Sequence, residues 1–421
     1  MNEQQSSYRQ ILKATSLFGG VQVFQIIISV IRSKFVAVLL GPTGMGIVGL
    51  LTSTTGLVSA ITSFGLGTST VKNISEANAT GDENRILSVI SVMRRLVWIT
   101  GSLGTIAMLV LSPWLSEVTF GNKDYTIAFI WLSTTLLFSQ LSTGQRVLLQ
   151  GLRKLKQLAK ANVYGSLCGL IITIPTYYKF GERGIVPVMV ITAIITLFFS
   201  WYFSRQTKLK TIKVSKEFTL SEGKNMLKMG FVISLSGLIS LLGAYLLRIF
   251  INRTGNVSDV GLYTAGFTIV GSYVGMIFNA MATDYYPRLS AVASSDEKCK
   301  LNINQQAEIA LLILAPILIV FLVFIKWAII LLYSTKFLGV NDMIYWAAIG
   351  MFFKAISWSI AFVFLAKGAS VLYFWNEFAG ESYTLGFNIL GYHLGGLTGL
   401  GISFLITYLI YMIQVFFIAK V

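Results

Sequence analysis

Long apolar runs, separated by short segments rich in Gly, Pro or charged residues, dominate the chain. About 20 helical residues cross the roughly 30 Å hydrocarbon core of a bilayer, so each run predicts one membrane-spanning helix. The predicted spans are 14–39, 44–70, 93–119, 125–150, 159–178, 184–203, 227–251, 259–283, 307–333, 342–366, 370–392 and 396–419. The pattern therefore predicts an all-α integral membrane protein with twelve transmembrane helices.

The composition argues against a soluble domain and against the common catalytic and metal-binding motifs. Of 421 residues, 55% are hydrophobic and only 12% are charged, against roughly 25% charged residues in ordinary soluble domains. Two cysteines and one histidine are too few for a disulfide framework or a His-built metal site, and no phosphate-binding loop motif is present. We expect no cofactor, no metal and no enzymatic activity.

The net charge of +16 would suggest nucleic acid in a soluble protein, but here the basic residues follow the predicted loops. Most of the 33 Lys and Arg, including Arg146 near the inner end of the fourth span, fall on the side that carries the N-terminus. The opposite loops hold only Lys123, Lys179, Arg183, Arg253 and Lys336. Because Lys and Arg in short loops stay in the cytoplasm, we expect a multi-pass protein with both termini cytoplasmic and no nucleic-acid partner.

The most basic loop divides six spans from six. Residues 215 apart also match, as with Gly46 and Gly261 or Gly56 and Gly271, which favours a parallel repeat with a cavity between its halves. We predict an N-terminal six-helix bundle over 1–203, a basic cytoplasmic linker over 204–226 and a C-terminal six-helix bundle over 227–421, around a central cavity.

Polar residues within the spans are the candidates for function, because an ionised group at the bilayer centre is costly without a partner or a wet cavity. In the first span Gln22, Gln25, Ser29 and Arg32 are spaced by 3, 4 and 3 residues and share one helix face. This face indicates either the wall of a hydrated cavity or hydrogen bonding between helices.

Further cations lie in the second half. Arg248 follows a face of small residues near the end of its span, where it either lines the cavity or extends toward the headgroups. Lys354 lies deep in the tenth span and requires a partner. Glu377 and Glu381 share one face of the eleventh span, and either neutralise Lys354, Arg32 or Arg248 or carry a proton during transport.

Two polar segments are expected near the membrane surface. Helix 82–95 is amphipathic with a cationic end, which is typical of a helix lying on cytoplasmic headgroups. Asp284 and Arg288 end the eighth span, and we interpret them as a solvated loop start.

Several motifs resemble the multidrug, oligosaccharidyl-lipid and polysaccharide exporter superfamily, and within it the Wzx-type flippases of lipid-linked O-antigen or enterobacterial common antigen units. The resemblance covers nearly the whole chain. The motifs that carry it are Leu40-Gly41-Pro42-Thr43-Gly44-Met45-Gly46, Gly65-Leu66-Gly67, Val71-Lys72-Asn73-Ile74-Ser75-Glu76, Leu149-Gln150-Gly151-Leu152-Arg153-Lys154, Ala161-Asn162-Val163-Tyr164-Gly165-Ser166-Leu167, Phe352-Phe353-Lys354-Ala355 and Ala366-Lys367-Gly368.

The resemblance implies alternating access by two bundles in the bacterial inner membrane. Its expected cargo is an undecaprenyl-diphosphate-linked oligosaccharide, held in a cationic lumen to which Arg32, Arg248 and Lys354 would contribute. Membrane lipids, a polysaccharide polymerase and chain-length proteins are the other candidate partners. A drug or cation antiporter of the same superfamily and a lipid II-type flippase are alternatives, although an antiporter for cations would favour an acidic lumen.

Overall fold

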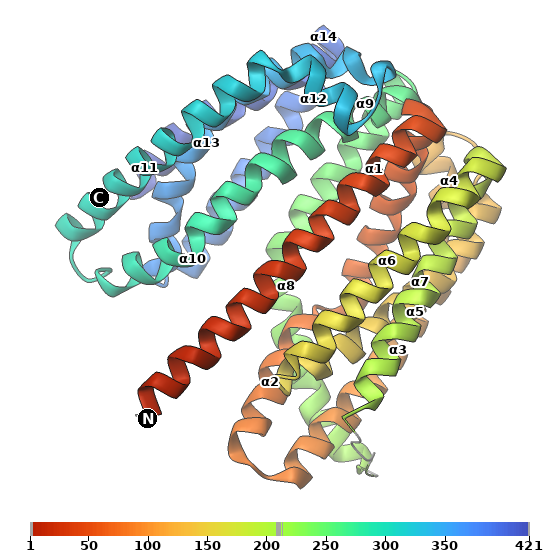
Figure 1. Ribbon diagram of the computed structural model, residues 1–421, viewed down its shortest axis with the longest axis vertical. Helices are drawn as coiled ribbons and strands as arrows, with labels where there is room; N and C mark the ends of the chain where they lie inside the picture. The colour runs from red at the N-terminus through yellow and green to blue at the C-terminus, as the bar shows by residue number, and fades with distance from the viewer. Residues whose placement is uncertain (1–2, 208–211, 213, 420–421) are drawn as a thin grey trace. The chain divides into compact units, whose positions relative to one another are not determined.

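The computed structural model describes residues 3–207, 212 and 214–419, and these contain helices but no strand (Figure 1). Side chains are described from Gly20 onward, except at 232, 233, 236, 272–274, 276, 279, 280, 283 and 370 within that part. Basic residues at positions 9, 13, 208, 210, 213 and 420, which enter the loop-charge argument, lie outside the described side chains. The all-helical fold class is confirmed.

The chain forms two compact units, one of Met1–Leu40 with Leu51–Leu238 and one of Gly41–Leu50 with Ile239–Val421. The helices of the first unit are α1 (Glu3–Ser63, apart from 41–50), α2 (Leu66–Thr80), α3 (Glu83–Val110), α4 (Ser112–Phe120), α5 (Thr126–Gly151), α6 (Leu155–Phe180), η1 (Gly181–Gly184), α7 (Ile185–Arg205) and the first part of α8 (Lys216–Thr254). Ile74, Val92 and Leu148 lie in its buried core, between α2, α3 and α5.

The second unit begins with the rest of α8. It continues with α9 (Val257–Phe267), the π-helical η2 (Thr268–Val274), α10 (Gly275–Ala291), α11 (Asp296–Val323), α12 (Ile325–Leu332), η3 (Thr335–Val340), α13 (Asn341–Ala366) and α14 (Ser370–Ala419). Its buried core joins α10, α11, α13 and α14 through Tyr285, Ile303, Phe364 and Val415.

Glycines interrupt the two longest helices where the sequence predicts breaks between spans. In α1, Gly41 has φ 67° and is followed by Pro42, which cannot donate the next helical hydrogen bond. In α14, Gly396 has φ 56°, a left-handed conformation that glycine adopts without a Cβ penalty. Each helix therefore supplies two of the predicted spans.

The predicted surface helix 82–95 is wrong, because α3 continues without interruption from Glu83 into the following span. The carboxylate of Asp82 caps it by accepting from the backbone N–H of Asn84 at 2.9 Å. The cations that suggested headgroup contact bind α8 instead: Arg85 pairs with Glu222, and Arg95 Nη1 donates to Thr219 Oγ1 at 2.7 Å. Helical periodicity alone does not separate a surface helix from the extension of a span.

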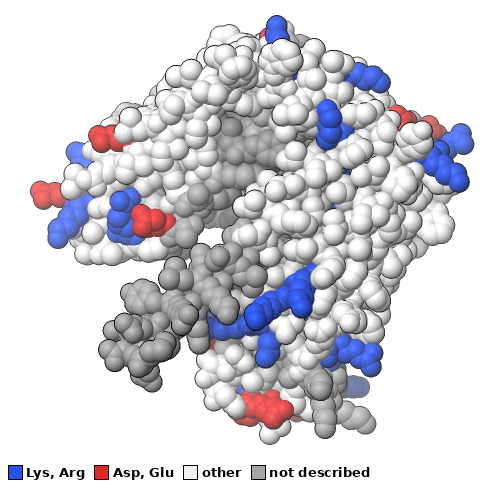
Figure 2. All heavy atoms as spheres, in the orientation of Figure 1, with Lys and Arg blue, Asp and Glu red and all other residues white. Residues whose placement is uncertain are grey.

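Among the described residues, seven helical stretches are long and apolar enough to cross a membrane. Gly20–Ser63, Leu155–Arg205 and Val371–Ala419 span 44, 51 and 49 residues, and each contains a break that divides it into two crossings. Figure 2 shows Lys, Arg, Asp and Glu mostly near the helix ends, with broad uncharged surfaces between them. The chain is a multi-pass membrane protein.

Two glycines 215 residues apart pack against each other in the second unit. A Cβ at Gly46 would collide with the carbonyl oxygen of Val257, and a Cβ at Gly261 would collide with that of Pro42. Pro42 and Val257 are also 215 residues apart, so the contact is reciprocal within the predicted repeat. This close crossing of α9 with residues 41–50 of α1 supports the repeat that the sequence suggests.

Candidate functional site

A cavity of about 480 Å³ opens within the first unit and contains three of the predicted site residues. Gln25, Ser29 and Arg32 reach it from one face of α1, as their spacing predicts. Hydroxyl and amide groups from α5, α6 and α7 complete the polar wall. They are Thr135, Ser139, Ser142, Asn162, Ser166, Thr192 and Thr196.

Arg146 brings a second guanidinium to this cavity. The loop-charge count takes Arg146 as a cytoplasmic loop residue although the predicted span 125–150 contains it. The structure places Arg146 inside α5, where its Nη2 donates to Thr143 Oγ1 at 3.2 Å. A signal for this was present, because Thr135, Ser139, Ser142 and Arg146 are spaced by 4, 3 and 4 residues and share one helix face. The polar face was overlooked because Arg146 was grouped with the basic residues of the loop that follows.

Arg32 is held by close packing against α6. Its Nη2 lies 3.2 Å from the position that a Cβ on Gly169 would occupy, so a larger residue there would require the guanidinium to shift by a few tenths of an ångström. Its Nε is buried and has no hydrogen-bond partner among the described residues. A buried donor of this kind is costly unless something accepts from it.

The electrostatics of the cavity follow from its composition. Arg32 and Arg146 are its charged residues, and none of the described residues lining it is Asp or Glu. Guanidinium groups bind phosphate through fork-like pairs of N–H donors. A wall of hydroxyls around two guanidinia is therefore suited to an anion with several acceptor oxygens.

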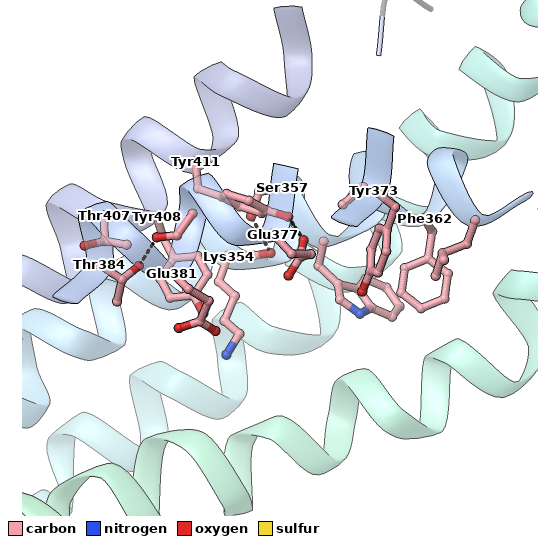
Figure 3. A pocket seen from close by; sticks show the side chains of 14 residues that line it. Lys354, Ser357, Phe362, Tyr373, Glu377, Glu381, Thr384, Thr407, Tyr408 and Tyr411 are labelled. Carbon is pink, nitrogen blue, oxygen red and sulfur yellow. Dashed lines mark hydrogen bonds between the residues drawn. The ribbon is translucent and has the colours of Figure 1, made fainter. Parts of the chain in front are cut away.

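The second unit contains two cavities, of about 190 and 250 Å³, that share Lys354, Glu381, Thr384, Thr407 and Tyr408 as lining residues. Lys354 extends from α13, and its Nζ lies 5.0 Å from the ring centre of Tyr408 and 5.8 Å from that of Phe404. Figure 3 shows the ammonium pointing the same way as the carboxylate of Glu381. Aromatic faces thus offset part of the cost of this intramembrane charge.

The two glutamates of α14 make hydrogen bonds, and the ion pairs found among the described residues involve other side chains. Glu377 accepts from the hydroxyl of Tyr411 (Figure 3). It also accepts from Asn376 Nδ2 at 3.4 Å. Glu381 accepts from Ser240 Oγ at 2.7 Å. Glu377 therefore links the two halves of α14, whereas Glu381 links α14 to α8.

Arg248 lies beside these cavities with its guanidinium already engaged. Its Nη1 donates to the carbonyl oxygen of Ala244 at 3.1 Å, and the group lies 5.7 Å from the ring centre of Tyr263. Ala244 and Tyr263 themselves line the 250 Å³ cavity. Its Nε is buried without a hydrogen-bond partner among the described residues, so this N–H is available as a donor.

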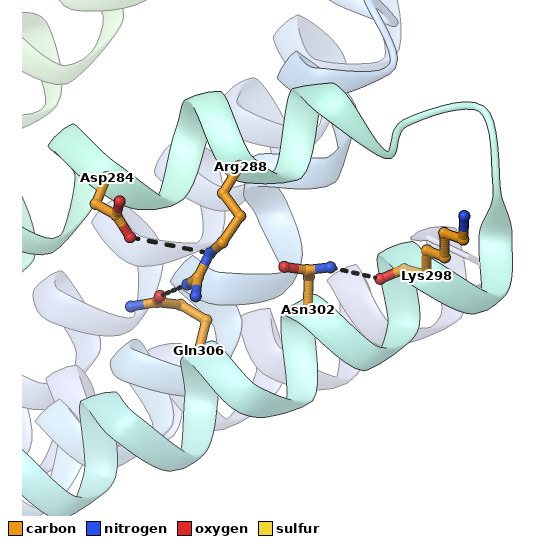
Figure 4. A network of polar contacts seen from close by, with 5 residues as sticks. All are labelled: Asp284, Arg288, Lys298, Asn302 and Gln306. Carbon is orange, nitrogen blue, oxygen red and sulfur yellow. Dashed lines mark hydrogen bonds and ion pairs between the residues drawn. The ribbon is translucent and has the colours of Figure 1, made fainter.

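Asp284 and Arg288 are more than a solvated loop start. Arg288 Nη2 donates to Gln306 Oε1 at 2.8 Å, and its Nε lies 3.9 Å from Asp284 Oδ2 (Figure 4). The guanidinium also lies 6.0 Å from the ring centre of Tyr285. These contacts join α10 to α11 near their connecting loop and give Arg288 a structural role.

Helical units with several membrane-spanning stretches and charged cavities define a multi-pass, all-helical membrane protein. Solved structures share this fold. An inward-facing multidrug resistance MATE family transporter of the MOP superfamily aligns with a TM-score of 0.80 at 19% identity, covering 94% of each chain. A MOP superfamily transporter from Pyrococcus furiosus, described as having a binding pocket of reverse polarity, aligns with a TM-score of 0.66 at 17% identity, covering 97% of this chain and 94% of its own.

Residues 35–342 match the model of the polysaccharide biosynthesis protein family. The chain belongs to this family. A comparison with curated proteins found no significant match in sequence. At these low identities the structural likeness shows the fold alone, so the activity must be argued from the cavities.

Proposed function

We propose that the protein is a Wzx-type flippase that moves undecaprenyl-diphosphate-linked oligosaccharide units from the cytoplasmic to the periplasmic leaflet of a bacterial inner membrane. Membership of the polysaccharide biosynthesis protein family supports the substrate class. The observation that carries the proposal is the first-unit cavity, in which Arg32 and Arg146 lie among hydroxyls without a carboxylate.

A diphosphate that crosses the membrane needs protein groups in place of its water. A doubly charged diphosphate enters an apolar core at high cost unless fixed cations and donors substitute for its hydration shell. Arg32 and Arg146 supply the fork-like donors, and Gln25 and Ser29 supply neutral ones. Lys354 adds a point charge in the second unit, and Arg248 offers its Nε donor. No covalent bond forms or breaks in this process.

A drug or cation antiporter is the second candidate, because Glu377 and Glu381 line a cavity of the second unit. However, Glu377 already accepts a hydrogen bond from Tyr411, and Glu381 accepts one from Ser240. The two arginines of the first-unit cavity would also repel a cation. A lipid II-type flippase would share the same diphosphate chemistry and differ in the sugar. The cargo tested must therefore separate diphosphate recognition from sugar recognition.

Native mass spectrometry of the purified protein tests the proposal directly. We expect undecaprenyl diphosphate carrying an oligosaccharide to be retained more tightly than undecaprenyl monophosphate or phospholipid. Arg32→Ala and Arg146→Ala should each weaken retention about tenfold or more, since one hydrogen bond to a charged group contributes about 1.5–3 kcal/mol. Arg183→Ala, at an exposed arginine in η1, is the matched control. Equal retention of phospholipid and the diphosphate lipid would contradict the proposal.

A further inference from the structure

Helices α6 and α7 pack side by side (Figure 1). A groove of about 480 Å³ lies between the beginning of α6 and the end of α7. The residues lining this groove are Lys160, Tyr164, Phe198, Phe199, Tyr202, Phe203 and Gln206. None of them lines the cavity that contains Arg32. The groove is thus a distinct feature of the first unit.

Its walls are aromatic and open to the surroundings. Tyr164, Phe198 and Tyr202 expose 46%, 52% and 50% of their surface. Tyr164 stacks against Phe199 and Phe203 with ring centres 5.8 Å apart in both pairs. The base of the groove is well packed, because Phe203 is buried in a cluster with Leu149, Leu158 and Ala161. A preformed slot of this kind suits an extended hydrocarbon chain.

The end of the groove is cationic. Lys160 is exposed at its rim, and Arg205 lies 5.2 Å from the ring centre of the neighbouring Trp201. Arg153, Lys154 and Lys156 are exposed where α6 begins. Residues 152–166 and 198–207 contain no Asp or Glu. An apolar slot with ammonium and guanidinium groups at one end matches a lipid whose headgroup is anionic.

An interfacial aromatic belt explains why Tyr and Trp lie at this depth, but a belt requires neither a hollow nor a lysine at its mouth. We propose that the groove binds one anionic glycerophospholipid, with an acyl chain along Tyr164, Phe198 and Tyr202 and the phosphate at Lys160. The cytoplasmic leaflet, where the loop charges place this end, supplies such lipids. Lys160 is the one cation among the described residues that line the groove itself, and one ammonium suits a monoanionic phosphodiester better than a diphosphate, for which paired guanidinia are the stronger ligands.

The inference is independent of the transported cargo and is testable on delipidated protein. Native mass spectrometry with phosphatidylglycerol and phosphatidylcholine of identical chains should show about a tenfold preference for the anionic lipid. Lys160→Gln should remove the preference, whereas Lys123→Gln, at an exposed lysine before α5, should retain it. Lys160→Arg should also retain it, because the charge survives. Tyr164→Ala combined with Phe198→Ala should weaken both lipids.

Three results would overturn the proposal. Equal binding of the two lipids by the unmodified protein would show that the rim does not recognise charge. An unchanged preference in Lys160→Gln, with an unchanged melting temperature, would place the site elsewhere. Displacement of phosphatidylglycerol by undecaprenyl diphosphate, with a larger loss of the diphosphate lipid in Lys160→Gln, would assign the groove to the cargo lipid instead.

Discussion

Single side chains carry intramembrane charge in this protein in three different ways. Arg32 packs against a glycine in a hydroxyl-lined cavity, Lys354 lies against aromatic rings, and Glu377 accepts hydrogen bonds from Tyr411 and Asn376. Each arrangement lowers the cost of placing an ionised group in an apolar medium. These differences are the basis for our proposal that Arg32 binds the cargo and that Glu377 serves helix packing.

The sequence predicted part of this arrangement. Helical spacing correctly gathered Gln25, Ser29 and Arg32, because their shared face depends only on local geometry. It missed Arg146, whose polar face runs into a basic loop. It also expected Glu377 or Glu381 to pair with a buried cation such as Lys354. Glu381 does line the same two cavities as Lys354, but the ion pairs found among the described residues do not include Lys354, whose ammonium lies near the rings of Tyr408 and Phe404. Partners on other helices depend on tertiary packing, which a single periodic pattern does not encode.

The Tyr411–Glu377 contact predicts a coupled loss of stability. Tyr411→Phe removes the donor and Glu377→Gln weakens the acceptor, and each should lower the free energy of unfolding by about 1–3 kcal/mol. The double variant should lose less than the two together, because the second change removes an interaction that is already broken. Thermal melts of the four proteins measure the coupling. Tyr408→Phe, which keeps its ring beside Lys354, is the control.

Strictly additive losses would show that Glu377 does not depend on Tyr411. Glu381→Gln should instead leave the melting temperature nearly unchanged, because among the described residues Glu381 accepts one hydrogen bond, from Ser240. A loss of transport in Glu381→Gln without a loss of stability would then assign Glu381 to the transport cycle. A large loss of stability there would refute this division between the two glutamates.

The sequence predicted the breaks within the longest helices better than it predicted where other helices begin and end. Gly41-Pro42 and Gly395-Gly396 interrupt α1 and α14 as their sequence predicts, because backbone conformation is a local property. The continuity of α3 was missed, because the helix predicted from residue 82 begins at its cap Asp82 but continues into the membrane span. The predicted span 44–70 likewise crosses the break before α2 at Gly65, which has φ 62°.

The reciprocal glycine crossing predicts matched effects of two distant substitutions. Gly46→Ala and Gly261→Ala should each destabilise the protein by about 1–3 kcal/mol, because a Cβ at either position meets a backbone carbonyl that cannot rotate away. Gly56→Ala is the control, since nothing lies within 4 Å of its added Cβ. Melting temperatures and expression levels check this. Unchanged melting of Gly46→Ala alongside Gly56→Ala would refute the tight crossing.

The whole molecule should orient in the membrane by its loop charges. With the two native cysteines, Cys168 and Cys299, replaced by Ala, a single cysteine at Ser215 should resist an impermeant thiol reagent added to intact cells. A single cysteine at Asn122 should react, because its loop carries few basic residues and faces outward. The reverse labelling pattern would invert the topology, and with it the proposed direction of transport.

The most direct test of the account is lipid translocation in proteoliposomes. The purified protein should move an undecaprenyl-diphosphate-linked oligosaccharide between leaflets, as measured by its accessibility to an external glycan-modifying reagent. Arg32→Ala and Arg146→Ala should each slow translocation at least about tenfold, Arg32→Lys should retain partial activity, and Arg183→Ala should match the unmodified protein. Translocation that is unchanged in both alanine variants, or uptake of cationic drugs without movement of the diphosphate lipid, would contradict the account.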